Sequence, residues 1–315
     1  MTPDSNRGSV LVTGATGLVG RNLLERLTAE GREVIGVGSE RDLRDADVAM
    51  ALLREVRPRV LFHLAARVGG IYANSTQKPG FYRDNVLINT HVVDAAVDAG
   101  VEYIFAMGTG CAYPKRLEGE VLHEADYLDG IPEPTNDAYA YAKRGMLVHL
   151  EALREEGVLE YCYCLPANLY GPHDNFHPTH SHVVPALVRR FVEARDAGRP
   201  DVSIWGDGSA KRDFLYIEDC IDAMMHLLHG RVSGAVNVAT GHQTSIRELA
   251  EAVKKASDFE GTISYDTSMP AGQAGRIFAT DRIRDAGWVP ATDLSSGLGR
   301  TVEWYREHRV EARER

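Results

Sequence analysis

The sequence is poor in cysteine, with four in 315 residues: Cys111, Cys162, Cys164 and Cys220. So few cysteines exclude a disulfide framework and are typical of a reducing compartment. A run of 18 apolar residues is missing as well, and the N-terminal stretch MTPDSNRGS is polar. We therefore expect neither a membrane-spanning helix nor a signal peptide, and we expect a cytoplasmic protein without a membrane partner.

Positive charge is also scarce. The chain has 35 Lys and Arg against 45 Asp and Glu, so its net charge is −10. This balance argues against nucleic acid as a partner, although a local basic pocket could hold a small anion. Only 6 of the basic residues are lysine, so each lysine stands out. The apolar share of 44% excludes disorder as the main state of the chain.

Short apolar runs alternate with segments of helical spacing in the first 170 residues. Strands are predicted at 10–13, 34–37, 60–64, 103–107 and 161–165. Helices are predicted at 17–30, 46–57, 79–99 and 137–156. This order predicts an α/β fold with a doubly wound, mostly parallel sheet, because such strands are buried on both faces. Later elements are expected near 183–197, 217–229 and 245–257 as helices and near 202–205 as a strand.

The first motif is Gly14-Ala-Thr-Gly17-Leu-Val-Gly20, which follows a strand and opens a helix. Glycines here allow a tight turn and let the backbone approach a pyrophosphate, and the helix N-terminus offers N–H groups and a partial positive charge. The strand–turn–helix context favours dinucleotide binding, with a purely structural turn as the alternative.

The second motif is Tyr139-Ala-Tyr-Ala-Lys143, whose outer residues share a helix face. A cationic lysine beside a phenol favours the phenolate, so we expect a lowered pKa for Tyr139 and a role in proton transfer. Thr109, just after a strand, could bond the carbonyl that Tyr139 protonates, because open α/β sheets bind ligands at strand ends. The simpler alternatives are a Tyr and a Lys on a helix surface and a Gly/Thr turn.

In this order, the glycine turn, Thr109, Tyr139 and Lys143 resemble the extended short-chain dehydrogenases/reductases. Longer matches are similar to the GDP-L-fucose synthase family: Ala65-Ala-Arg-Val-Gly-Gly-Ile71, Cys111-Ala-Tyr-Pro-Lys115, Glu133-Pro-Thr-Asn136, Asn168-Leu-Tyr-Gly-Pro-His-Asp-Asn-Phe-His-Pro178 and Ser181-His-Val-Val-Pro-Ala-Leu187. The similarity runs over most of the chain. We expect a Rossmann-like dinucleotide-binding domain over 1–170 and a smaller, mainly substrate-binding region over 171–315, interleaved with the end of the sheet.

The resemblance implies conversion of a GDP-4-keto-6-deoxyhexose, in this family GDP-4-keto-6-deoxy-D-mannose to GDP-L-fucose, by C3/C5 epimerisation and NADPH-dependent C4 reduction. Tyr139 would donate the proton for reduction, Lys143 would tune it and hold the nicotinamide ribose, and Thr109 stands where the family usually has serine. Cys111 and His182 match the family's acid/base pair for epimerisation, and side chains of ordinary pKa ~8.5 and ~6.5 suit that task. Nucleotide-sugar contacts are implied for Asn168, Arg190, Trp205, Arg212 and Arg276. A homodimer through the helices near 79–99 and 137–156 is implied too.

The cofactor is expected to be NADPH, with NADH as an alternative. The family often has a basic residue for the 2′-phosphate where this chain has Thr16. However, no acid closes the second strand at Val37-Gly38, where an NAD enzyme would bond the ribose hydroxyls, and Arg41 could serve a phosphate. The expected cofactor contacts are Gly14, Thr16, Gly17, Leu18, Val19, Arg41, Asp42, Leu43, Ala65, Ala66, Lys143 and His182. A second departure from the family is the segment 269–276, which has lost charged residues near the expected sugar-nucleotide site.

Four histidines, at 173, 177, 180 and 182, fall within ten residues. They could contribute an active-site histidine, cover a loop surface or bind zinc, but the intervening prolines and the lack of cysteine at ligand spacing argue against a metal. Two rival functions stay open. One is a related nucleotide-sugar 4-reductase or epimerase acting on another hexose or heptose. The other is a non-catalytic cofactor-sensing protein, which would have no need of a proton donor.

Overall fold

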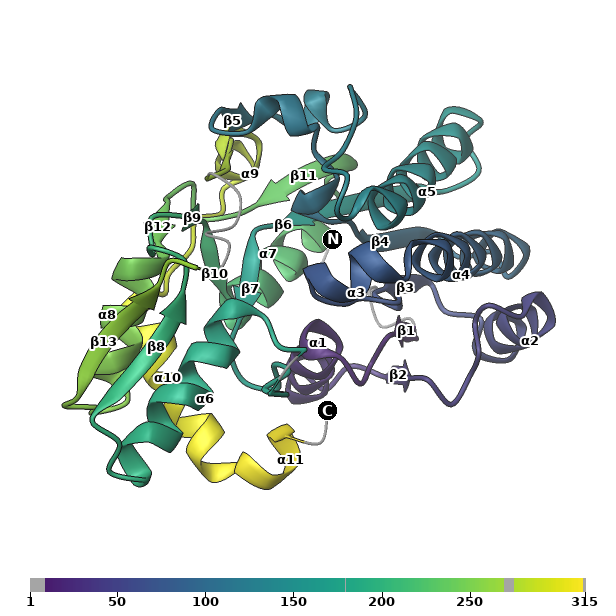
Figure 1. Cartoon of the computed structure of the whole chain (residues 1–315). Helices are drawn as coiled ribbons and strands as arrows, with labels where there is room; N and C mark the ends of the chain where they lie inside the picture. The colour runs from purple at the N-terminus through teal and green to yellow at the C-terminus, as the bar shows by residue number, and fades with distance from the viewer. Residues whose placement is uncertain (1–8, 179, 269–274, 314–315) are drawn as a thin grey trace.

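The computed structural model describes residues 9–178, 180–268 and 275–313, and its centre is a six-stranded sheet (Figure 1). The strands are β1 (Val10–Thr13), β2 (Val34–Val37), β3 (Val60–His63), β4 (Tyr103–Met107), β6 (Glu160–Pro166) and β11 (Gly234–Val238). They lie in the order β11-β6-β4-β3-β1-β2, and every neighbouring pair runs parallel. The predicted α/β class with a parallel sheet is confirmed.

Helices cover both faces of this sheet. One face carries α2 (Ala46–Val56), α4 (Lys78–Asp98) and α5 (Asp137–Glu155), which pack side by side at the right of Figure 1. The other face carries α1 (Leu18–Ala29) and α7 (Ile217–His229), which contact each other. The predicted helices and strands of the first 170 residues are confirmed to within one residue at either end.

The order of the strands creates a crevice at their carboxyl ends. From β1 the chain adds β2 on one side and β3 on the other, so the connections diverge between β1 and β3. Ligands of open α/β sheets bind at such a switch point. We therefore expect the ligand site at the segments that follow β1, β2, β3 and β4.

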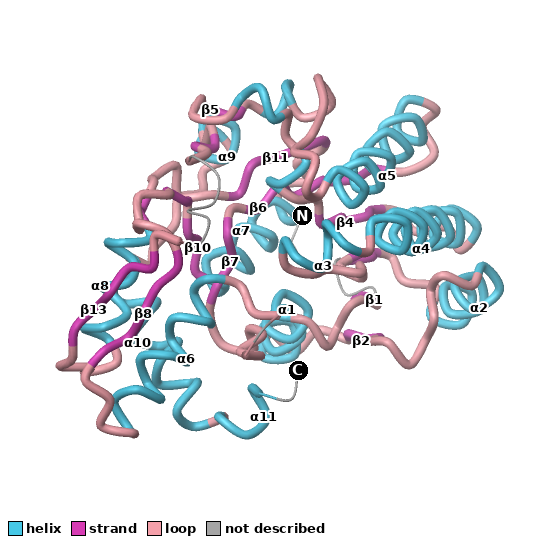
Figure 2. The backbone as a smooth tube through the Cα atoms, viewed as in Figure 1, coloured by secondary structure: helices cyan, strands magenta, loops and turns pink. Residues whose placement is uncertain are grey.

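Smaller elements form a second layer beside the main sheet, and Figure 2 shows them as short strands between helices. The paired short strands are β5 (Val121–Leu122) with β14 (Ile277–Phe278), β7 (Asn168–Tyr170) with β10 (Phe214–Tyr216), β8 (Asp201–Trp205) with β13 (Thr262–Asp266), and β9 (Lys211–Arg212) with β12 (Thr244–Ser245). The other helices are α3 (Ile71–Thr76), α6 (Val183–Asp196), α8 (Ile246–Ala256), α9 (Asp281–Asp285), α10 (Leu294–Glu307) and α11 (Arg309–Arg313), with 3₁₀ turns η1 (Gly110–Ala112), η2 (Lys115–Leu117) and η3 (Glu124–Asp126). No helix in the described part of the chain is long and apolar enough to cross a membrane.

Candidate active site

The glycine turn between β1 and α1 is shaped by two close approaches of backbone. Gly14 has φ +71°, and a Cβ there would lie 2.7 Å from the Ala65 nitrogen. A Cβ on Gly20 would collide with the Gly14 carbonyl group. Helix α1 begins after Gly17, which has no side chain to cap it, so its first N–H groups stay available to a ligand. This cradle fits the pyrophosphate of a dinucleotide.

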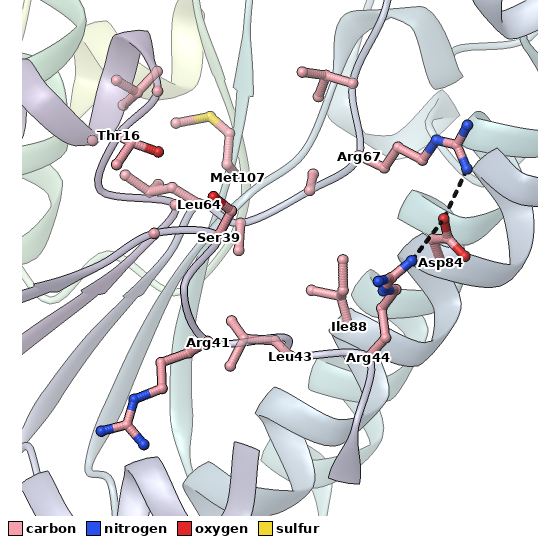
Figure 3. A pocket seen from close by; sticks show the side chains of 18 of the residues that line it. Thr16, Ser39, Arg41, Leu43, Arg44, Leu64, Arg67, Asp84, Ile88 and Met107 are labelled. Atoms are coloured by element: carbon pink, nitrogen blue, oxygen red, sulfur yellow. Dashed lines mark hydrogen bonds and ion pairs between the residues drawn. The ribbon is translucent and has the colours of Figure 1, made fainter. Parts of the chain in front are cut away.

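A pocket of about 650 Å³ opens beside this turn, at the carboxyl ends of the central strands (Figure 3). Its walls contain Tyr139 and the predicted cofactor contacts Gly14, Thr16, Gly17, Leu18, Val19, Arg41, Asp42, Leu43, Ala65, Ala66 and Lys143. His182 is not among the lining residues. Ten further residues that line the pocket were not predicted from the sequence: Gly20, Gly38, Ser39, Arg44, Leu64, Arg67, Val68, Asp84, Ile88 and Met107. The strand-end rule that drew attention to Thr109 could have found Leu64 and Met107, because they follow β3 and end β4.

Tyr139 and Lys143 lie together on α5, in the wall of the pocket. The Lys143 Nζ is 6.0 Å from the centre of the Tyr139 ring and donates a 2.8 Å hydrogen bond to the Met107 carbonyl oxygen. Lys143 is 1% exposed. Burial lowers the pKa of Lys143 to about 7, so its charge changes near neutral pH.

The predicted lowering of the Tyr139 pKa is wrong. Burial raises the pKa of this phenol, and the nearby Cys111 and Tyr127 act in the same direction. Lys143 does not reverse the shift, because it lies 6.0 Å from the ring centre and burial takes its own pKa to about 7. Tyr139 therefore carries its proton at neutral pH, which is the state that a proton donor needs.

Thr109 and Cys111 continue from β4 into the turn η1. The Thr109 Oγ1 accepts a 3.2 Å hydrogen bond from the Cys111 N–H, and the Arg276 Nη1 donates a 2.9 Å hydrogen bond to the carbonyl oxygen of the residue between them. The Cys111 side chain is exposed and interacts electrostatically with Tyr139 and Arg212. The structure thus brings five predicted site residues together beside the pocket.

Arg212 and Arg276 form a pair of neighbouring cations in this cluster. Burial lowers the pKa of the Arg212 guanidinium, and the positive charge of Arg276 lowers it further. Two arginines close to one another suit a ligand with two negative charges, such as a pyrophosphate. Of the segment 269–276, residues 269–274 lie outside the described part of the chain.

The remaining predicted substrate contacts come from β7, α6 and β8. The Arg190 guanidinium lies 5.9 Å from the centre of the Trp205 ring, which is 60% exposed. The Arg190 Nη1 also donates a 3.1 Å hydrogen bond to the Ser203 carbonyl oxygen. The Asn168 side chain donates a 2.9 Å hydrogen bond to the Asp213 carbonyl oxygen. An open indole face held beside a cation is a surface on which a flat base can stack.

The histidines of the loop 171–182 are not gathered around one point. His173 bonds Glu25 through its Nε2 at 2.8 Å, and the His177 and His180 rings stack on each other. Among residues 9–178, 180–268 and 275–313, no group of three ligating side chains could hold a metal. His182 is the N-cap of α6, and desolvation by the surrounding protein lowers the pKa of its imidazole, so the ring is neutral at pH 7 and can accept a proton.

The end of β2 differs from its prediction in one respect. No acid stands at 37–38, but Glu40 folds back, and its Oε1 accepts a 2.7 Å hydrogen bond from the Gly38 N–H. Arg41, expected to serve a phosphate, lines the pocket, but its side chain extends away from the other labelled residues in Figure 3 and lies 3.5 Å from Glu55. A carboxylate is therefore present where the sequence suggested none.

Comparisons with known proteins give consistent results. Residues 10–239 match the model of the NAD dependent epimerase/dehydratase family. The chain is 40% identical to the probable GDP-L-fucose synthase 1 of Oryza sativa subsp. japonica, over 97% of this chain and 94% of that protein. It is 34% identical to the GDP-L-fucose synthase of Escherichia coli K12, over 95% and 97%. A crystal structure of a GDP-L-fucose synthetase from Naegleria fowleri bound to NADP superposes with a TM-score of 0.87 at 29% identity, covering 99% of this chain and 97% of that one.

Proposed function

The chain belongs to the NAD dependent epimerase/dehydratase family, and we propose that it is an NADPH-dependent epimerase/reductase that converts GDP-4-keto-6-deoxy-D-mannose to GDP-L-fucose. One observation carries the proposal: a dinucleotide pocket with Tyr139 and Lys143 in its wall adjoins a cluster with an exposed thiol, Cys111, and two arginines. Similarity over nearly the whole chain to GDP-L-fucose synthases supports the same substrate and cofactor.

Reduction is assigned to the side chains at the junction of pocket and cluster. The cofactor supplies a hydride to C4 when bound, and the glycine cradle fits its pyrophosphate. Tyr139, protonated at neutral pH, donates a proton to the C4 oxygen, and the Thr109 hydroxyl donates a hydrogen bond to the same oxygen. Lys143 holds the nicotinamide ribose. Its pKa of about 7 lets it return a proton toward Tyr139 between turnovers.

Epimerisation is assigned to Cys111 and His182. The 4-ketone acidifies the hydrogens on C3 and C5, so one group can remove a proton from one face of the ring and another can return it on the opposite face. The negative charge that develops on the C4 oxygen is stabilised by donors and cations aimed at it. The Tyr139 and Thr109 hydroxyls, which are assigned to this oxygen in the reduction step, are the donors at this point.

The nucleotide is assigned to the second layer of the fold. Trp205 and Arg190 offer a stacking surface for the base, and the Arg212–Arg276 pair faces the pyrophosphate. Asn168 contributes a polar contact from β7. On this assignment residues 1–170 bind the dinucleotide and residues 171–315 mainly bind the nucleotide sugar, with β11 of the second segment paired to β6 of the first.

A homodimer and a cytoplasmic location complete the proposal. Tyr82 on α4 and Tyr141 and Val148 on α5 are 49%, 44% and 52% exposed, so the outer face of these helices offers apolar surface to a second copy. An exposed thiol that works as an acid or base must stay reduced, which the cytoplasm ensures.

The test measures both half-reactions at once. NADPH absorbance is followed with a panel of 4-keto nucleotide sugars in heavy water, and deuterium at C3 and C5 is measured in the product. We expect oxidation of NADPH with GDP-4-keto-6-deoxy-D-mannose and deuterium at both carbons. Oxidation without deuterium would indicate a reductase only, whereas cofactor binding with no turnover on any sugar would indicate a sensor.

A further inference from the structure

The wall of the dinucleotide pocket beyond the glycine turn carries charges of both signs. Arg44 lines the pocket and forms a two-point ion pair with Asp42, at 2.8 and 2.7 Å. Arg67 also lines it and donates a 2.8 Å hydrogen bond to Asp84, which Figure 3 shows between the two arginines. Both cations are therefore already neutralised by carboxylates of the same wall.

Arg41, the third arginine of this wall, also has a carboxylate partner. Its Nη2 is 3.5 Å from the Glu55 carboxylate on α2, and in Figure 3 its side chain extends away from the other labelled residues. A 2′-phosphate on the adenosine ribose would have to draw Arg41 or Arg44 away from its partner. Each arginine that lines this wall is thus paired with a carboxylate.

Glu40 adds a negative charge at the same place. Its Oε1 accepts the Gly38 N–H at 2.7 Å, and a Cβ built on Gly38 would lie 2.7 Å from both the Glu40 Oε2 and the Thr16 Cγ2. Since Thr16 and Gly38 both line the pocket, the carboxylate stands at the edge of the wall between the glycine turn and the end of β2. The Gly38 hydrogen bond lowers the pKa of Glu40, so it is ionised at neutral pH.

We propose that Glu40 is a specificity-determining residue, whose carboxylate accepts a hydrogen bond from the adenosine ribose and opposes a 2′-phosphate. An ionised carboxylate only accepts hydrogen bonds, which matches a ribose hydroxyl and conflicts with a phosphate. The enzyme then binds NADH with an affinity within about tenfold of that for NADPH. The inference rests on the proposed function, because it requires that the pocket hold a nicotinamide dinucleotide.

The test is a set of dissociation constants measured by isothermal titration calorimetry with NADPH and NADH separately. Glu40→Gln should tighten NADPH binding about five- to tenfold, as expected for one unit charge removed a few ångströms from the phosphate in a water-like medium. It should weaken NADH binding a few-fold. Glu55→Gln should also tighten NADPH binding, because it releases Arg41. Glu260→Gln, an exposed carboxylate between α8 and β13, is the matched control and should change neither constant.

The outcomes separate the two proposals. A wild-type preference for NADPH clearly above about tenfold, or a Glu40→Gln variant indistinguishable from Glu260→Gln, would overturn the role of Glu40 while leaving the proposed function intact. A wild-type protein that binds neither dinucleotide would overturn the proposed function and this inference with it.

Discussion

Replacement of Lys143 by methionine should stabilise the protein while it abolishes reduction. Lys143 is 1% exposed and has no carboxylate partner in the described part of the chain. Burial lowers its pKa from 10.5 to about 7. Between these two pH values the unfolded chain holds a proton that the folded chain has lost, so the free energy of unfolding rises with pH. Methionine keeps the length of the side chain and removes this penalty.

The expected magnitude follows from the two pKa values. At about 1.36 kcal/mol for each pH unit, burial of Lys143 costs about 4 kcal/mol at pH 7 and about 1.5 kcal/mol at pH 9.5. The methionine variant also loses the hydrogen bond from Nζ to the Met107 carbonyl oxygen, which contributes about 1–2 kcal/mol. The variant should therefore be more stable than the wild type by about 2–3 kcal/mol at pH 7 and equally stable near pH 9.5.

The assay is urea unfolding of both proteins at several pH values between 7 and 9.5. The difference in the free energy of unfolding between variant and wild type removes the contribution of groups that titrate alike in both proteins. Lys255→Met, on the exposed face of α8, controls for the loss of one lysine and should show no such pH dependence. A Lys143→Met protein that is less stable than the wild type at pH 7, or a difference that stays constant with pH, would refute burial of Lys143 as the cause of its low pKa.

The site supports three more tests. Tyr139→Phe should bind NADPH normally but oxidise it ~10²–10⁴-fold more slowly, since a general acid is lost. The control Tyr141→Phe, on the exposed side of α5, should leave the rate unchanged. Equal rates in both variants would exclude Tyr139 as the proton donor. Cys111→Ala should stop deuterium incorporation at C3 and C5, measured by mass spectrometry, while NADPH oxidation continues on the uninverted sugar; wild-type incorporation would remove the thiol from the mechanism. Gly14→Ala should lose calorimetric NADPH binding, because its Cβ would lie 2.7 Å from the Ala65 nitrogen, whereas Gly31→Ala has the same positive φ but nothing within 4 Å and should bind normally.

Most of the fold could be predicted because its main elements are long and strongly patterned. The buried strands around Leu11, Phe62 and Ile104 are mostly apolar, with Thr13 and His63 as polar exceptions at the ends of β1 and β3, and the helices between them bury one face each. The two-residue strands, such as β9 and β12, have no measurable period and were not predicted. Strand β11 was missed although it joins the main sheet, because its pairing with β6 is set by tertiary packing.

In the candidate site, too, local patterns could be predicted from the sequence, whereas features set by tertiary packing could not. The glycine turn and the spacing of Tyr139 and Lys143 are local patterns, and the pocket contains both. The direction of the Tyr139 pKa depends on how deeply α5 is buried, which the spacing does not reveal. The pairing of Arg41 with Glu55 joins two residues from different segments, so the sequence could offer Arg41 as a phosphate ligand but not show where its side chain is held.

A buried chain of hydrogen bonds behind the pocket shows most clearly what local patterns cannot supply. The Thr13 hydroxyl lies 2.9 Å from the His63 Nδ1, the His63 Nε2 lies 3.2 Å from the Asn89 Oδ1, and the Asn89 Nδ2 donates to the Ala142 carbonyl oxygen. Because the amide oxygen of Asn89 can only accept, His63 donates from Nε2 and accepts the Thr13 hydroxyl proton at Nδ1. Burial, together with the charge of Lys143, lowers the pKa of His63 to about 3, so the ring stays neutral and the direction of the chain does not change with pH. These hydrogen bonds connect the ends of β1 and β3, which carry the dinucleotide cradle, to the backbone of α5, which carries the proton donor. The bonded residues lie 26 to 53 positions apart in the sequence, so no local pattern could reveal their pairing.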